Sequence, residues 1–137
     1  MSAFSNYLEQ KLVDYLKGTA MPTAPATTYV EMWASAGNDA ASNVGVVTSL
    51  SRASVAGSAW TTATGTDGNG DFHSITNTAS VVITTSATAS ATVSAFGVYD
   101  APTAGNLLWW GTLSSPKTLT VADELKFNAS NLALQIY

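Results

Sequence analysis

The segment at residues 96–111 constrains the fold more than any other, because two apolar runs flank a short polar connection. The runs Phe-Gly-Val-Tyr and Leu-Leu-Trp-Trp-Gly are rich in strand-forming residues, and the connection contains Asp, Pro, Gly and Asn, which are typical of turns. This pattern predicts an antiparallel β-hairpin. Asp100 starts the connection, and we expect its carboxylate to accept hydrogen bonds from the backbone of the turn.

Short runs of strand-forming residues recur along most of the remaining chain, with turn residues between them. The expected strands cover residues 27–33, 45–50, 53–55, 59–64, 80–85, 91–99, 107–113, 117–121, 124–127 and 132–137. Because no helices alternate with these strands, the order predicts a mainly β fold, either an antiparallel β-sandwich or a jelly-roll-like domain. The clearest turn is expected at residues 66–71. Residues 114–116 are expected to separate the strand at 107–113 from the strand at 117–121. Residues 84–92, which are rich in threonine, are expected to be ordered.

One amphipathic helix is predicted near the N-terminus, over residues 6–17, with Asn6 as N-cap, Glu9 three residues on and Gly18 as the stop. Its apolar residues recur at helical spacing: Leu8, Leu12, Tyr15 and Leu16. A helix of about three turns is not stable alone in water, so it must pack on the sheet or on another chain. We therefore divide the chain into a helical arm (residues 1–20) and a single β-sandwich domain (residues 21–137), which begins with a proline-containing linker at residues 21–25.

Composition limits the function classes. The 137 residues fit one domain, and only 10% of them are charged. The five basic residues are scattered, so no basic stripe is present for nucleic acid. No apolar run is long enough to span a bilayer, and Glu9 and Asp14 replace the basic and apolar parts of a signal peptide, so we expect a soluble chain that is not exported. With no cysteine, disulfides and thiolate sites are absent.

Residues 67–71 have the opening spacing of a calcium loop, since Asp67, Asn69 and Asp71 supply oxygen ligands at alternate positions. Two later positions of that motif do not fit, because Phe72 stands where glycine is required and Thr78 where a glutamate should close the site. The pattern therefore favours a surface turn over a metal site.

No catalytic set emerges from the remaining polar residues. His73 is the only histidine and could act as a general base beside Asp67 or Asp71, but no nucleophile motif accompanies it, which favours a turn histidine. Asp123 and Glu124 are adjacent, so on a strand they would face opposite sides and could not flank a sugar together; a solvated turn explains them better. We expect no enzyme, no cofactor and no bound metal.

Trp109 and Trp110 are consecutive on an expected strand, so their side chains must face opposite sides of the sheet. One can fill the core, while the other must meet solvent, the helix or another chain, which makes it a candidate interface anchor. The same applies to Tyr137. The full set of candidate interface residues is Tyr7, Leu8, Leu12, Tyr15, Trp109, Trp110 and Tyr137. The tryptophans could alternatively form a platform for sugar stacking.

Three stretches carry a family likeness. The first is Ser-Asn-Tyr-Leu-Glu-Gln-Lys-Leu at 5–12, and the second is Thr-Tyr-Val-Glu-Met-Trp at 28–33. The third runs from Phe-Gly-Val-Tyr-Asp-Ala at 96–101 through Gly-Asn-Leu-Leu-Trp-Trp-Gly at 105–111, with Lys-Thr at 117–118 after it. In order and spacing they resemble a family of small virion proteins of tailed bacteriophages, described as tail-fibre-like or as minor capsid and decoration (cement) proteins. The middle, residues 36–90, matches weakly. There, Leu-Ser-Arg at residues 50–52 keeps the arginine of a family element without its tyrosine.

The resemblance implies a non-enzymatic virion component that is made in the host cytoplasm. A capsid decoration protein that clamps neighbouring capsid subunits is favoured, because the chain is compact and lacks coiled-coil heptads. Its expected partners are the major capsid protein or another virion protein, and further copies of itself, with a trimer favoured. The alternatives are a tail-fibre or tail-adaptor protein that serves host attachment, and a carbohydrate-binding module or lyase-like enzyme built on the same sandwich.

Overall fold

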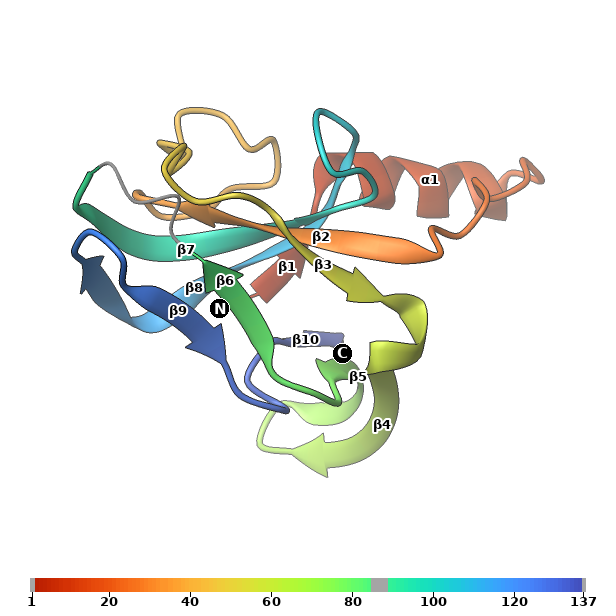
Figure 1. Ribbon diagram of the computed structural model, residues 1–137. Coiled ribbons are helices and arrows are strands. Elements are labelled where there is room, and N and C mark those ends of the chain that lie inside the picture. The colour runs from red at the N-terminus through yellow and green to blue at the C-terminus, as the bar shows by residue number, and fades with distance from the viewer. Residues whose placement is uncertain (1, 85–88, 137) are drawn as a thin grey trace.

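The computed structural model describes residues 2–84 and 89–136 (Figure 1). Its elements in chain order are β1 (Ser2–Phe4), α1 (Asn6–Leu16), β2 (Thr27–Trp33), β3 (Ala53–Ala56), the 3-10 turn η1 (Gly57–Ala59), β4 (Trp60–Asp67), β5 (Gly70–Asn77), β6 (Val81–Thr84), β7 (Ala91–Tyr99), β8 (Leu107–Leu119), β9 (Glu124–Phe127) and β10 (Ala133–Ile136). The prediction of a mainly β chain with one N-terminal helix is confirmed.

The strands of the described residues form three antiparallel sheets. The largest has the order β1-β8-β7-β2-β3, and the smaller ones have the orders β10-β5-β4 and β6-β9. Figure 1 shows the five-stranded sheet as one layer, with the two smaller sheets together below it. The hydrophobic core lies between these layers, because buried residues from both contribute to it, such as Val98 of β7 and Ile83 of β6.

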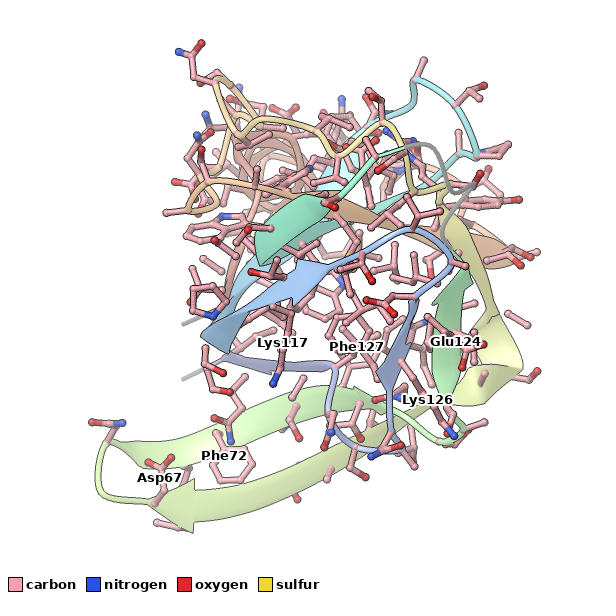
Figure 2. The ribbon with its side chains drawn as sticks, turned by 60° about the vertical axis from the view of Figure 1, so that its left-hand side comes forward. Asp67, Phe72, Lys117, Glu124, Lys126 and Phe127 are labelled. Atoms are coloured by element: carbon pink, nitrogen blue, oxygen red, sulfur yellow. The ribbon has the colours of Figure 1, made fainter. Side chains whose placement is uncertain are left out.

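Aromatic side chains join the two layers. The ring of Phe96 lies edge-on to Trp109 of its own sheet, with 5.5 Å between centroids, and to Phe127 of β9, with 5.7 Å. Trp60 of β4 also contacts Trp109, at 5.9 Å. Figure 2 shows Phe127 in the interior, between the sheets. Burial of each such side chain contributes about 1.5–3 kcal/mol to folding, so this aromatic group is a main source of cohesion between the layers.

The hairpin predicted at residues 96–111 is confirmed. β7 and β8 pair antiparallel, with Phe96 opposite Gly111 and Val98 opposite Trp109. As expected, the Asp100 carboxylate closes the connection: it accepts hydrogen bonds from the backbone N–H of Asn106 (2.7 Å) and from its side-chain amide (2.8 Å).

Three details of the strand prediction are wrong. Residues 45–50 form no strand, because Gly45 takes a positive φ of 63° and Val46 makes only a single bridge, to Trp33. Leu107–Leu119 is one strand, so residues 114–116 do not end it. They lie at an irregularity in the register between the pairs Ala95–Thr112 and Val93–Lys117, where β8 has more residues than β7. β1 and β5 were not predicted. Of the segment 84–92, residues 85–88 lie outside the described residues.

Candidate docking surface on the N-terminal helix

The start of α1 is fixed to the five-stranded sheet by Ser5, which is fully buried. Its backbone N–H donates to the carbonyl of Leu108 (3.0 Å), and its hydroxyl donates to the carbonyl of Leu107. The hydroxyl oxygen also accepts from the backbone N–H of Leu8 (3.2 Å), so Ser5 is the N-cap. The predicted N-cap, Asn6, is therefore wrong, and the helix begins at a point anchored on β8.

The rest of α1 is far less covered. None of its residues is buried, and the exposed fractions of its large apolar side chains rise toward its end, from 39% for Leu12 to 53% for Val13, 58% for Tyr15 and 84% for Leu16. The helix then stops at Gly18, as predicted, which has a φ of 92° and donates its N–H to the carbonyl of Tyr15. We call Leu12, Val13, Tyr15 and Leu16 the helix surface.

A groove of about 570 Å³ lies beside α1. Its walls come from the first half of the helix, from residues 21–25 and from both sheet layers; mostly apolar side chains line it, among them Phe4, Leu8, Met21, Trp60, Leu134 and Ile136. In Figure 1, α1 lies beside the five-stranded sheet, and the chain after it loops outward before it returns to β2. The groove and the helix surface thus adjoin on the same helix.

The candidate interface residues on the helix divide between these two features. Tyr7 and Leu8 are half-buried and line the groove, whereas Leu12 and Tyr15 belong to the helix surface. Trp109 also borders the groove, but it is only 5% exposed and packs in the core. Tyr137 lies outside the described residues.

Trp110 faces away from Trp109, as the alternation predicted, but the chain itself covers it. Its indole N–H donates to the Asp39 carboxylate (2.8 Å), and its ring lies so close to Gly37 that a Cβ there would collide with it. The loop that carries these residues is held by Asn38, whose side-chain oxygen accepts from the N–H groups of Ala40 and Ser42. Sequence reasoning considered solvent, the helix and another chain as neighbours of Trp110 and missed this loop.

Arg52 forms a polar cluster that the sequence did not reveal. Its Nε donates to the Glu31 carboxylate (2.9 Å), and both side chains are 12% exposed. One terminal nitrogen donates to the carbonyls of Ala101 and Ala104, each at 2.8 Å, and the guanidinium lies 3.7 Å from the centroid of the Tyr99 ring. Arg52 thus ties the loop between β7 and β8 to the sheet.

Glu31 has a second partner in this cluster, since the Trp33 indole N–H donates to its other carboxylate oxygen (3.0 Å). Burial, together with the negative charge of Glu31, raises the pKa of Tyr99 far above its ordinary value of 10.0. Tyr99 is therefore neutral at physiological pH. The hydrogen bonds and the salt bridge of this cluster hold its residues in place.

Three of the acidic residues considered for chemistry make hydrogen bonds at turns, whereas Glu124 is not in a turn as predicted but on β9. Asp67 accepts from the N–H of Asn69 (2.8 Å), and Asp71 accepts from the Thr66 hydroxyl (2.6 Å). The Asp123 carboxylate accepts from both the N–H and the hydroxyl of Thr120, and these bonds lower its pKa.

His73 is not a turn residue as predicted, because it lies on β5. Over residues 2–84 and 89–136, no group of three histidine or acidic side chains could hold a metal ion. Within the same ranges, no helix is long and apolar enough to cross a membrane.

A protein-family model matches residues 3–135 of the chain, and the family is described as Podophage GP4 fiber I protein gp80. The chain belongs to this family. The gp80 fibre family thus confirms the resemblance to virion proteins of tailed phages, and the match includes α1, all residues named for the groove except Ile136, and the weakly matching middle of the chain. No curated protein matches the chain. A phage virion structural protein of this kind contacts other virion proteins, so the contact surface is the functional site to identify.

Proposed function

We propose that this chain is a non-enzymatic module of a phage fibre, and that the helix surface docks it on a neighbouring virion protein. The observation that carries the proposal is the contrast along α1, whose start is anchored by buried Ser5 while Leu16 near its end is 84% exposed. A helix that is anchored at its start and exposes apolar side chains can place them in an apolar groove of a partner protein, which is a common mode of recognition. The family description, which names a fibre protein, supports the fibre role.

The size of the surface suits attachment through many copies. Burial of a large apolar side chain contributes about 1.5–3 kcal/mol, and association costs several kcal/mol. The four residues of the helix surface, with the adjoining groove, therefore support an interaction of moderate strength. When many copies bind one particle, avidity makes such contacts sufficient.

One observation supports the non-enzymatic part of the proposal, and a second one argues against carbohydrate binding. Glu31, Asp100 and Asp123 hold a salt bridge or turn hydrogen bonds, so each has a structural task. A sugar-stacking platform has little support, since Trp33 is fully buried and Trp109 only 5% exposed.

Capsid decoration is the second candidate function. It is supported by the neutral surface expected when only 10% of residues are charged, which suits close packing against a shell. In that case the helix surface would contact the major capsid protein. The site of attachment on the virion distinguishes the two functions.

The test uses phage particles that carry Leu16→Glu. The helix surface then gains a charge that docking would bury unpaired, so we expect the amount of this protein in purified virions to fall at least about tenfold. Thr19→Glu is the matched control, because it adds the same charge to an exposed position just beyond the helix. Normal incorporation of a folded Leu16→Glu protein would contradict the proposal.

A further inference from the structure

The hairpin β4–β5 leaves a long strand edge uncovered. β4 is the outer strand of the sheet β10-β5-β4, and within residues 2–84 and 89–136 no strand pairs with its other side. Four consecutive residues of β4, Thr61 to Thr64, are exposed. Figure 2 shows the hairpin at one extremity of the molecule, with Asp67 near its turn and Phe127 far away in the interior.

The register identifies which backbone groups face outward. The N–H of Thr78 donates to the carbonyl of Ala59 (2.8 Å), and the pairing continues without a shift to Asp67 opposite Gly70. In an antiparallel pair, hydrogen-bonded positions alternate, so Thr61, Ala63 and Gly65 bond to β5. The residues between and beside them therefore direct their N–H and C=O groups outward: Thr62, Thr64 and Thr66, together with the carbonyl of Trp60. The N–H of Trp60 is already used, since it donates to the carbonyl of Gly57.

β4 lacks the features that protect other strand edges. Proteins commonly guard edges with charges, proline, bulges or short strands. In this chain β1, β3 and β10 have three or four residues, and β9 carries Glu124 and Lys126. β4 has eight residues, no proline, no basic residue and one acid, Asp67 at its end. Its glycine is covered by Phe72 directly opposite, whose ring would lie 2.8 Å from a Cβ at Gly65.

We infer that β4 pairs antiparallel with β4 of a second copy of this chain, which joins two three-stranded sheets into one. This pairing is closed and two-fold symmetric. With Ala63 on the two-fold axis, Thr62 lies opposite Thr64 and Trp60 opposite Thr66, so all four outward residues are used. The neighbouring registers that also place outward residues opposite each other are shifted by two positions, and they leave Trp60 or Thr66 opposite a residue outside β4. The same register puts Asp67 opposite Ala59 of the second copy, so the two negatively charged Asp67 side chains do not face each other.

The contact is independent of the helix surface, since α1 is anchored on the five-stranded sheet, whereas β4 is the edge of the sheet β10-β5-β4. It is also pairwise, so the trimer favoured from the family resemblance would need another surface. An extended segment of a different virion protein could add to the same edge. The experiments below separate that occupant from a second copy.

Because the natural chain has no cysteine, a single introduced cysteine reports on the register. In the inferred pairing, the two copies of Ala63→Cys have Cα atoms about 4.5 Å apart, within the range of a disulfide. Thr61→Cys is the matched control, since its two copies lie about 13 Å apart along the paired strands. We expect the purified full chain with Ala63→Cys to form disulfide dimers under mild oxidation, and the control not to. Equal cross-linking of the two variants, or none, would overturn the inference.

Charge substitutions test the same contact without covalent capture. Thr62→Lys with Thr64→Lys places like charges opposite each other twice, whereas Thr62→Lys with Thr64→Glu places opposite charges there. Sedimentation equilibrium of the two folded proteins should show dimer affinities that differ by at least about tenfold. Equal affinities would contradict the register, and a monomeric state of the natural chain and of both variants at millimolar concentration would contradict self-pairing.

Discussion

Arg52→Met is predicted to destabilise the fold because Arg52 is the cationic centre of a nearly buried cluster. The change removes the salt bridge to Glu31 and two hydrogen bonds to loop carbonyls, but keeps most of the apolar stem. Removing one partner of a buried pair costs about 3–5 kcal/mol, and the exposed fraction of 12% on each side chain favours the lower end. We expect the free energy of unfolding to fall by about 3 kcal/mol and Tm by about 10 °C.

The measurement is urea denaturation, followed by tryptophan fluorescence, with the slope m unchanged if unfolding remains two-state. Glu31→Gln completes a double-mutant cycle. Because the double variant leaves no unpaired carboxylate, its loss should be smaller than the sum of the single losses by about 1–3 kcal/mol. A loss below about 1 kcal/mol for Arg52→Met, or strict additivity, would refute this account of the cluster.

Three further predictions concern stability and charge. Asn77→Ala removes three hydrogen bonds made by a fully buried side chain and should cost about 3 kcal/mol in thermal or urea unfolding; a loss below about 1 kcal/mol would contradict it. Gly97→Ala places a Cβ 2.7 Å from Cη2 of Trp33, so calorimetry should show a loss of about 1–3 kcal/mol, whereas unchanged stability would show that the ring can move. Asp123 has a lowered pKa, so its turn bonds stabilise the fold above the pKa of about 3.9 found in unfolded chains, and this contribution disappears as pH falls through the folded pKa. Carbon-detected NMR titration should give Asp123 a pKa below 3.8, and Thr120→Ala should raise it.

The sequence predicted the elements whose signal is local. The hairpin at residues 96–111 combined apolar runs with turn residues, and α1 combined helical spacing with Gly18, so both were recognised. β5 was missed because its residues, Gly-Asp-Phe-His-Ser-Ile-Thr-Asn, are largely polar, and its strand state depends on pairing with β4 and β10. β1 has only three residues, too few to show a period.

The contacts around the site depend on residues far apart in the sequence, which no local pattern encodes. The alternation of Trp109 and Trp110 was read correctly, yet the cover over Trp110 comes from Gly37 and Asp39, about seventy positions earlier. Arg52 likewise reaches a loop that follows β7. For α1, the sequence left two neighbours open, the sheet and another chain. In the structure, the start of α1 is hydrogen-bonded to the sheet, whereas the side chains of the helix surface are exposed.

The central claim is that the helix surface attaches this chain to the virion, and cryo-electron microscopy of the intact particle tests it most directly. In a map that resolves side chains, Leu12, Tyr15 and Leu16 should be covered by an adjacent virion protein. The claim would be contradicted if these three side chains faced solvent while another part of the chain made the contact.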